Sequence, residues 1–314
     1  MYRCQSSTTC QMCYSPGDMF RRLKNSLIYI FARISLFLVG NIPRKQVSRA
    51  GRILGAAASI IAWKERQTAE HQLSSALNLP KKDRRLRVLA RGVFRELSTS
   101  AVEMCLLRRC KDKTPEVTLT ESSKKVLEKA LALEKGVVFV TGHIGNWELM
   151  ALTLAGLGYP ISTVAKGSYD PRFTVLIEGF RRAAGVHSIY RGEPGFSAKM
   201  LRALRKNRIL GLLIDQDTTV PSVFVSFFGK PASTPVGAAV LALRTEAPVV
   251  VGTIHRSPTG RHFIDIERVE LPEDPERATA LLTCHLEKRI RNHPAQWVWF
   301  HRRWKTAPEI EGQP

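Results

Sequence analysis

The residues of this chain best suited to chemistry are a histidine and a glutamate, His143 and Glu148, in the segment GHIGNWE at 142–148. A carboxylate beside an imidazole fixes its tautomer and stabilises the imidazolium, which is the usual way to build a general base. On one continuous helix, residues five apart would point about 140° away from each other. The pair can therefore meet only if His143 lies in a turn, for which Gly142 and Gly145 supply the backbone freedom. We interpret the segment as a site of proton abstraction.

This histidine has alternatives to a catalytic role. A lone histidine beside a tryptophan is more often a helix cap or a satisfied core residue. A zinc helix needs a second histidine four residues away, and the sequence has none at that spacing. A metal site built from Cys4, Cys10 and Cys13 lacks the matching second pair of ligands. We therefore expect no metal and no other cofactor.

The segments around His143 alternate between strand and helix patterns. Strands are predicted at 137–141, 161–165, 187–190 and 209–214, and helices at 146–157, 171–184 and 196–206. Further on, the sequence predicts a buried strand at 248–253, an edge strand at 264–269 and a closing helix at 275–291. This alternation predicts an α/β fold with a mostly parallel sheet flanked by helices. In such sheets the site lies beyond the carboxyl ends of the strands, where His143 is expected.

The segment at 142–148 resembles the His-x4-Asp/Glu motif of the glycerolipid acyltransferase superfamily, in the form carried by the late acyltransferases of lipid A biosynthesis. The resemblance covers about residues 69–305, and its further blocks follow in the same order: YRG at 190–192, DQD at 215–217, FFGKPA at 227–232 and QWVWFHRRWK at 296–305. It implies a glycerolipid acyltransferase-like fold. It also implies transfer of a fatty acyl chain from an acyl carrier protein thioester to a hydroxyl of a lipid A precursor or a related glycolipid.

The resemblance implies a role for particular residues. His143 and Glu148 would form the catalytic dyad, and Arg191 would hold the anionic head group of the acceptor or the phosphopantetheine arm of the donor. Aromatic rings of the last block would lie at the depth of the lipid head groups, with Arg302 or Arg303 on lipid phosphate. The remaining substrate-binding residues implied by the resemblance are Asn146, Asp215, Gln216 and Asp217.

The N-terminal part of the chain predicts association with a membrane. An apolar run at 27–40 contains Arg33 and is shorter than the about 18 to 20 residues that span a bilayer. Basic residues flank it and the next apolar segment, as expected at an anionic cytoplasmic membrane face, although an ordinary helical hairpin packed on the domain is the alternative. We expect residues 1–18 to be an extension or a misassigned start, 19–68 to be membrane-associated helices, 69–305 to be the acyltransferase domain and 306–314 to be a flexible tail.

The charge of the chain indicates an anionic partner. It carries 48 Lys and Arg against 27 Asp and Glu, a formal net charge of +21. Such a surface attracts nucleic acid, an anionic membrane or an acidic protein. No nucleic-acid partner is expected, because the sequence has no zinc-finger spacing and no ribonucleoprotein motif. The resemblance favours the acidic acyl carrier protein, an anionic glycolipid acceptor and inner-membrane lipid as partners.

Two further functions remain open at this point. The first is acyl transfer to a lysophospholipid or another glycolipid. The second is a non-catalytic protein that binds membranes or nucleic acid through its basic surface alone. The six cysteines are too few and too irregularly spaced for a disulfide framework, so a reducing compartment fits best. Together with the resemblance, this favours the cytoplasmic face of a bacterial inner membrane.

Overall fold

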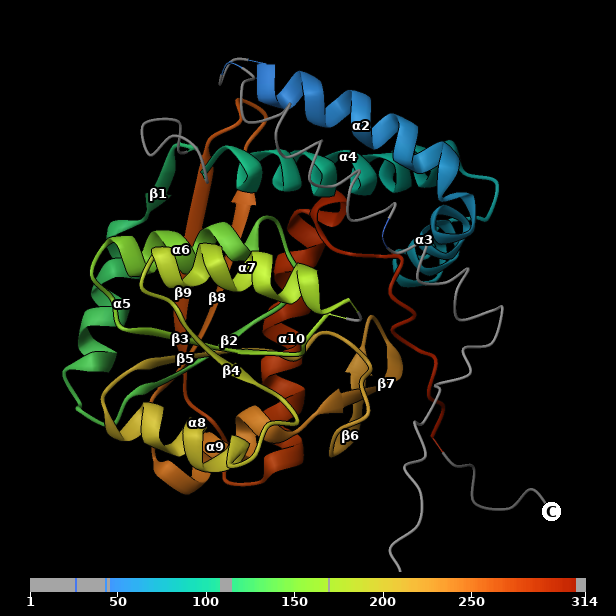
Figure 1. The fold of residues 1–314 in the computed structure, drawn as a ribbon. Helices are drawn as coiled ribbons and strands as arrows, with labels where there is room; N and C mark the ends of the chain where they lie inside the picture. The colour runs from blue at the N-terminus through green and yellow to red at the C-terminus, as the bar shows by residue number, and fades with distance from the viewer. Residues whose placement is uncertain (1–25, 27–42, 44–45, 108–114, 169, 309–314) are drawn as a thin grey trace, which may run out of the picture.

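A central seven-stranded sheet organises the protein (Figure 1). The computed structural model describes residues 26, 43, 46–107, 115–168 and 170–308. The strand order is β1-β9-β8-β2-β5-β3-β4, and β6 and β7 form a separate two-stranded sheet. The strands are β1 (Val117–Leu119), β2 (Val137–Thr141), β3 (Ile161–Ala165), β4 (His187–Tyr190), β5 (Ile209–Leu213), β6 (Ser222–Phe227), β7 (Lys230–Pro235), β8 (Val249–Arg256) and β9 (His262–Val269). Within the large sheet only β8 and β9 pair antiparallel, which confirms the predicted mostly parallel sheet.

The strand at 264–269 was predicted to be an edge strand, and that prediction is wrong. In the structure β9 lies between β8 and β1, and the edge position belongs to β1. β1 is only three residues long. So short a segment shows no alternation of apolar and polar residues from which a strand could be predicted.

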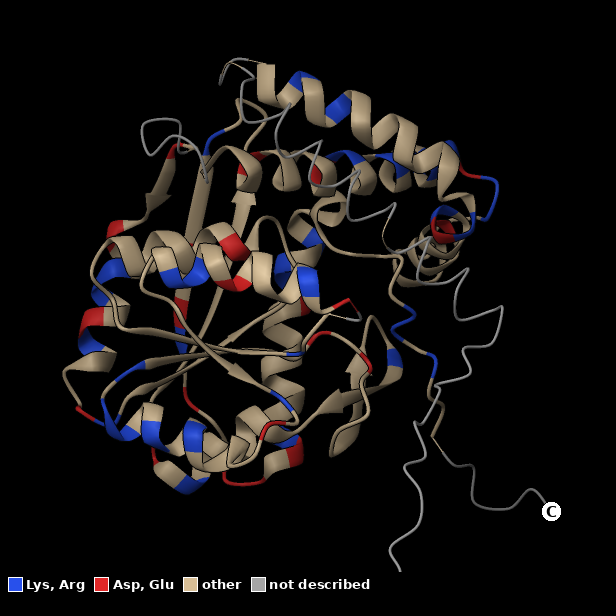
Figure 2. Ribbon diagram, in the orientation of Figure 1, with Lys and Arg blue, Asp and Glu red and all other residues tan. Residues whose placement is uncertain are grey.

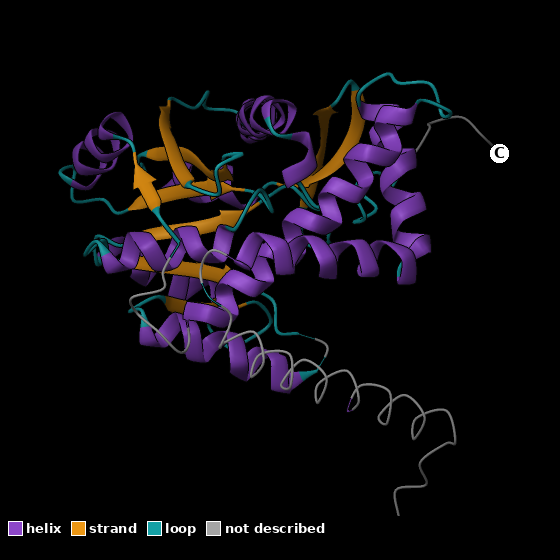
Figure 3. Ribbon diagram, turned by 90° about the horizontal axis from the view of Figure 1, so that it is seen from above, coloured by secondary structure: helices purple, strands orange, loops and turns teal. Residues whose placement is uncertain are grey.

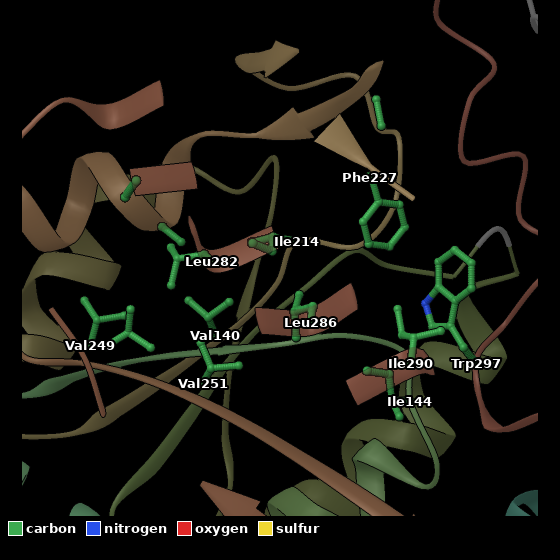
Figure 4. Packing of buried hydrophobic residues seen from close by; sticks show 14 of the residues in the cluster. Val140, Ile144, Ile214, Phe227, Val249, Val251, Leu282, Leu286, Ile290 and Trp297 are labelled. Carbon is green, nitrogen blue, oxygen red and sulfur yellow. The ribbon is translucent and has the colours of Figure 1, made fainter. Parts of the chain in front are cut away.

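Strand β2 is buried on both faces, which explains its continuous apolar run. Val138 and Val140 belong to one core cluster, and Val137 and Phe139 belong to the cluster on the opposite face. Figure 4 shows Val140 beside residues of β8 and of the last long helix, with Ile214 close by. The strand that leads to His143 is therefore fixed from both sides.

Helices cover both faces of the sheet. In Figure 1, α6 and α7 lie on one side, and α8 and α9 lie on the other. The helices of this body are α5 (Glu121–Leu131), α6 (Trp147–Gly156), α7 (Pro171–Ala183), α8 (Phe196–Arg205), α9 (Gly237–Thr245) and α10 (Pro275–Asn292), followed by the short 3-10 helix η3 (Pro294–Gln296). The predicted helices at 146–157, 171–184, 196–206 and 275–291 agree with α6, α7, α8 and α10 to within one residue at each end.

Within the described residues, three helices precede the α/β body: α2 (Val47–Ile61), α3 (Trp63–Ala76) and α4 (Arg84–Leu107). Helix α2 runs along α4, and this is seen from two directions in Figures 1 and 3. Two glycines allow the close approach, because a Cβ on Gly51 would lie 2.1 Å from the hydroxyl of Thr99 and one on Gly55 would lie 2.5 Å from the Cα of Arg95. Glycine at these positions lets the two backbones touch.

The predicted domain boundary at residue 68 falls inside α3, which continues to Ala76. Ala69, Leu73 and Ala76 of this helix belong to the main core cluster, so α3 packs on the same core as the sheet. The predicted extension at 1–18, the apolar run at 27–40, the three N-terminal cysteines and most of the tail at 306–314 lie outside the described residues. Among the helices that are described, none is long and apolar enough to cross a membrane.

Candidate active site

His143 lies in the turn between β2 and α6, as predicted from its flanking glycines. Gly145 adopts a positive φ of 60°, and a Cβ there would lie 2.1 Å from the carbonyl oxygen of Ile254. Only glycine fits both the conformation and the space. A Cβ on Gly142 would lie 3.0 Å from the carboxyl group of Asp215, so this turn passes directly over that side chain.

The imidazole of His143 is held by Asp215, which follows β5. Nδ1 of His143 lies 2.9 Å from Oδ1 of Asp215, and the backbone N–H of His143 donates to Oδ2 at 2.7 Å. The two residues meet because β2 and β5 are neighbours in register: Thr141 pairs with Leu213, and each site residue comes two positions after this pair. The carboxyl ends of parallel strands thus bring the base and its carboxylate together.

The electrostatics of this pair favour an ionised carboxylate. Burial opposes ionisation of Asp215, but the charge of His143, together with hydrogen bonds from His143 and Trp297, lowers the pKa of Asp215 to about 2. An ionised carboxylate only accepts hydrogen bonds, so in the neutral form of the ring Nδ1 carries the proton and Nε2 presents its lone pair. Nε2 has no hydrogen-bond partner within the described residues, and the His143 side chain is 23% exposed. The edge-on ring of Trp147, with its centroid 4.9 Å from that of His143, packs against the imidazole.

Glu148 does not orient His143 in the structure, and the predicted dyad is corrected in this respect. The carboxylate of Glu148 points toward α7, where Nε and Nη2 of Arg181 donate to its two oxygens. Burial disfavours the charged guanidinium, but the hydrogen bond and charge of Glu148 outweigh it and raise the pKa of Arg181. Glu148 lies in the first turn of α6, past the turn that carries His143, which is why the two side chains separate. Arg181 itself was not singled out from the sequence.

Asn146 was expected to bind substrate, and the structure gives it a structural position. Its side-chain oxygen accepts from the backbone N–H of Leu149 and so caps α6, while its amide group donates to Glu103 at 3.0 Å. The residue is 3% exposed. Because both ends of the amide are used and buried, Asn146 fixes the turn of His143 rather than facing a ligand in this structure.

The other predicted binding residues lie at the carboxyl edge of the sheet. Arg191 follows β4, and its guanidinium has no hydrogen-bond or ion-pair partner among the described residues. Gln216 is half-buried beside Asp215. Asp217 is buried and accepts from the backbone N–H of Thr306 at 2.9 Å and from its hydroxyl at 3.1 Å. In this structure Asp217 therefore fastens the C-terminal segment to the end of β5.

Comparison with known proteins shows the family of the chain. The family model described as bacterial lipid A biosynthesis acyltransferase matches residues 18–306. The chain belongs to this family. It is 26% identical over 282 residues to the lipid A biosynthesis palmitoleoyltransferase of Escherichia coli K12, and the match covers 87% of this chain and 89% of the relative.

Two further relatives match over a shorter region. The chain is 30% identical over 182 residues to a phosphatidylinositol mannoside acyltransferase of Mycobacterium tuberculosis H37Rv, with 57% of each protein covered. It is 28% identical over 188 residues to the lipid A biosynthesis lauroyltransferase of Escherichia coli K12, with 57% and 59% covered. These matches span a little over half the length of the relatives. All three relatives are acyltransferases by name.

The C-terminal aromatic and basic block of this family member is largely core, which corrects the expected contact with lipid. Trp297 and Trp299 are 1% and 0% exposed, and Arg303 is fully buried. The guanidinium of Arg303 donates to the carbonyl of Ser233 and lies 5.0 Å from the ring centroid of Phe227. Burial lowers the pKa of Arg303 to about 10. Arg302, by contrast, is exposed.

Sequence reasoning also missed a buried ionic network behind the turn. Glu103 on α4 accepts from Arg256 at 2.8 Å and lies 3.0 Å from Nε2 of His262, in addition to its contact with Asn146. Burial opposes its ionisation, but His262 and Arg256 lower the pKa of Glu103 to about 2. The three residues come from α4, β8 and β9, so spacing along the chain gives no signal of the network.

Proposed function

We propose that this protein is a membrane-associated O-acyltransferase that moves a fatty acyl chain from a thioester donor to a hydroxyl of an anionic glycolipid, with His143 as general base. One observation carries the proposal: Asp215 holds Nδ1 of a partly exposed imidazole at the carboxyl edge of a mostly parallel sheet, and Nε2 of that ring has no partner among the described residues. Membership of the family supports it. Asp215 takes the orienting role that the sequence assigned to Glu148.

The arrangement is suited to a direct transfer. Nε2 of His143 accepts the proton of the acceptor hydroxyl, and the resulting alkoxide attacks the carbonyl carbon of the thioester. The new C–O bond forms, the C–S bond breaks, and the thiolate leaves with the proton that the imidazolium returns. Asp215 stays ionised throughout and stabilises the imidazolium, because its low pKa keeps the proton on the ring.

The relatives and the charge of the chain support a particular donor and acceptor. We take an acyl carrier protein thioester as donor, since the net charge of +21 favours an acidic carrier. A match that covers most of both chains is to a lipid A palmitoleoyltransferase, which supports a lipid A precursor or a related glycolipid as acceptor. The similarity to a phosphatidylinositol mannoside acyltransferase keeps other glycolipids as the second candidate.

Helix α2 supports association with a lipid surface, which we place at the cytoplasmic face of the inner membrane. This helix buries small residues and exposes large apolar ones: Ile53, Leu54, Ile60 and Ile61 are 43% to 80% exposed, and Trp63 at the start of α3 is 49% exposed. Arg49 and Arg52 are exposed on the same helix, and Figure 2 shows basic residues along α2 and α4. Apolar and basic side chains on one helix are the combination that binds an anionic interface.

A product assay tests the proposal. The purified protein is incubated with acyl carrier protein thioesters and coenzyme A thioesters of graded chain length, together with a lipid extract, and products are identified by mass spectrometry. We expect one glycolipid to gain the mass of one acyl chain, with the carrier protein thioester as the better donor. The matched His143→Gln variant should give no product.

The same assay separates the competing functions. Acylation of a lysophospholipid in place of a glycolipid would instead favour a lysophospholipid acyltransferase. Absence of any acylated product, combined with salt-dependent binding to a nucleic-acid duplex, would favour a binding protein without catalysis. Equal activity of His143→Gln and the parent would reject the general-base role.

A further inference from the structure

The indole of Trp297 contacts the carboxylate that holds the histidine. Its Nε1–H donates to Oδ2 of Asp215 at 2.7 Å, and the two residues are only 1% and 2% exposed. We propose that Trp297 is a positioning residue of the acyl-transfer site, which acts on His143 through Asp215, so that the C-terminal segment completes the active site. The proposal rests on the function proposed above.

The hydrogen bonds to Asp215 show what Trp297 adds. Oδ1 receives Nδ1–H of His143, and Oδ2 receives the backbone N–H of His143 together with the indole N–H. Rotation about the bond that carries the carboxylate is soft, because such terminal torsions are broad. A donor from a third chain segment fixes the plane of the carboxylate and hence the direction in which Oδ1 meets the imidazole. The same donor also stabilises the negative charge.

The backbone holds Trp297 on the turn of His143. Ile144 and Trp297 form an isolated antiparallel bridge, and the N–H of Gly145 donates to the carbonyl of Gln296 at 2.8 Å. The side chain of Gln296 in turn bonds both backbone groups of Arg256 on β8. Three segments that are distant in sequence therefore close around Asp215: the β2–α6 turn, the end of β5 and the segment after α10.

Aromatic packing holds the indole in its orientation. The ring of Phe227 meets it edge-on at 5.6 Å between centroids, and that of Trp299 does so at 4.6 Å. Figure 4 shows Trp297 close to Phe227 and Ile144, at one end of the core cluster. A tryptophan fixed on both its backbone and its ring can set the position of the group that its N–H contacts.

Trp299 offers a matched control for a purely structural role. It is buried to 0%, packs in the same aromatic cluster and also uses its indole N–H, which donates to the carbonyl of Pro294 at 2.6 Å. Replacing either tryptophan by phenylalanine removes one N–H and leaves a ring. The two variants differ in that only Trp297 contacts Asp215.

The experiment compares Trp297→Phe and Trp299→Phe in the full-length protein. Steady-state acyl transfer gives kcat and KM, thermal unfolding gives Tm, and NMR of protein labelled with 15N at histidine gives the Nδ1–H resonance of His143, assigned with His143→Gln. We expect Trp297→Phe to lower kcat about tenfold or more with little change in KM, and to shift the Nδ1–H resonance. Trp299→Phe keeps a ring beside Trp297 and leaves the Trp297–Asp215 contact in place. It should lower Tm by a similar amount, but lose less kcat and shift the Nδ1–H resonance less than Trp297→Phe does.

Two results would overturn the proposal: parent-like kcat and resonance in Trp297→Phe, or an equal loss of kcat in both variants. If Trp297→Phe does not fold, the indole N–H resonance of Trp297 is compared between Asp215→Asn and the parent instead. A shift of that resonance, with none for Trp299, supports the contact, and no shift refutes it. The NMR readout needs no substrate, so a parent protein without acyl transfer would reject the proposed function while the role of Trp297 toward Asp215 is still decided.

Discussion

Replacing Asp215 by asparagine is expected to remove the base function of His143 while the fold stays intact. In the parent, Oδ2 accepts two N–H groups and Oδ1 accepts Nδ1–H of His143. The single oxygen of an asparagine satisfies the two donors, and its NH2 group then points at Nδ1. Nδ1 must become the acceptor, and the ring proton moves to Nε2, which can no longer take the proton of the substrate hydroxyl.

The size of the effect follows from this change of tautomer. An Asp to Asn change that traps a catalytic histidine in the wrong tautomer lowers kcat about 10⁴-fold in serine proteases. We expect a loss of about 10³- to 10⁴-fold here, which corresponds to about 4 to 5 kcal/mol of the activation barrier. The assay is kcat for acyl transfer at saturating donor and acceptor, with circular dichroism and Tm to confirm folding.

A second His–Asp pair supplies the control. Nδ1 of His255 lies 3.3 Å from Oδ2 of Asp265, so Asp265→Asn makes the same chemical change beside another imidazole. This variant should keep kcat within about a factor of two, since it leaves His143 and Asp215 in place. A folded Asp215→Asn protein with kcat within about tenfold of the parent would refute the reasoning.

Four further variants test other parts of the account. Glu103→Gln should lower the free energy of unfolding by about 3 kcal/mol, since Arg256 and His262 keep their buried positions. The pKa of Glu103 is about 2 in the folded protein, against an ordinary 4.5. The ionised carboxylate therefore stabilises the fold above pH 4.5, and this stabilisation is lost as the pH falls toward about 2. In urea unfolding at a series of pH values, the free energy of unfolding should therefore fall less between neutral and acid pH in the variant than in the parent. Glu148→Ala should lower kcat about 10- to 100-fold with folding intact, because Arg181 loses its bidentate partner, and full activity would contradict this. Gly145→Ala should lower the free energy of unfolding by more than about 2 kcal/mol, since its Cβ meets the carbonyl of Ile254, while Gly179→Ala on exposed α7 should not destabilise the protein. Ile60→Asp with Ile61→Asp should abolish cosedimentation with anionic vesicles at unchanged Tm, because both side chains are at least 70% exposed, and unchanged binding would remove α2 from the membrane contact.

Local pattern was sufficient to predict most of the body. β3 and β4 agree with the predicted strands at both ends, and β2 agrees as well, because glycines and turn residues bound apolar runs at these places. The position of β9 between two strands was missed because it depends on pairing with β1, a contact between residues far apart in sequence. Pairing partners are not encoded in the period of a single strand.

The candidate site, too, was predictable only where it depends on local pattern. The turn of His143 was predictable from Gly142 and Gly145, whereas its carboxylate partner was assigned to Glu148, which lies near in sequence. The true partner, Asp215, reaches the imidazole because β5 is the neighbour of β2, and the strand order was unknown. The position of Asp215 directly after an apolar strand was the available signal.

The C-terminal block was misjudged for a related reason. Alternating aromatic and basic residues describe a lipid interface and a polar contact inside an aromatic core equally well. Arg303 is accommodated in the core because the carbonyl of Ser233 and the hydroxyl of Thr234 accept from its guanidinium. Those acceptors come from β7, which sequence spacing does not place beside residue 303.

The single-turnover rate of acyl transfer in His143→Ala tests the central claim most directly. The variant is mixed with excess carrier protein thioester and the glycolipid identified with the parent, and product is followed by mass spectrometry. The account predicts a rate at least about 10³-fold below that of the parent, with the fold unchanged. A rate within about tenfold of the parent would contradict it, because within the described residues no other partly exposed imidazole is held by a buried carboxylate.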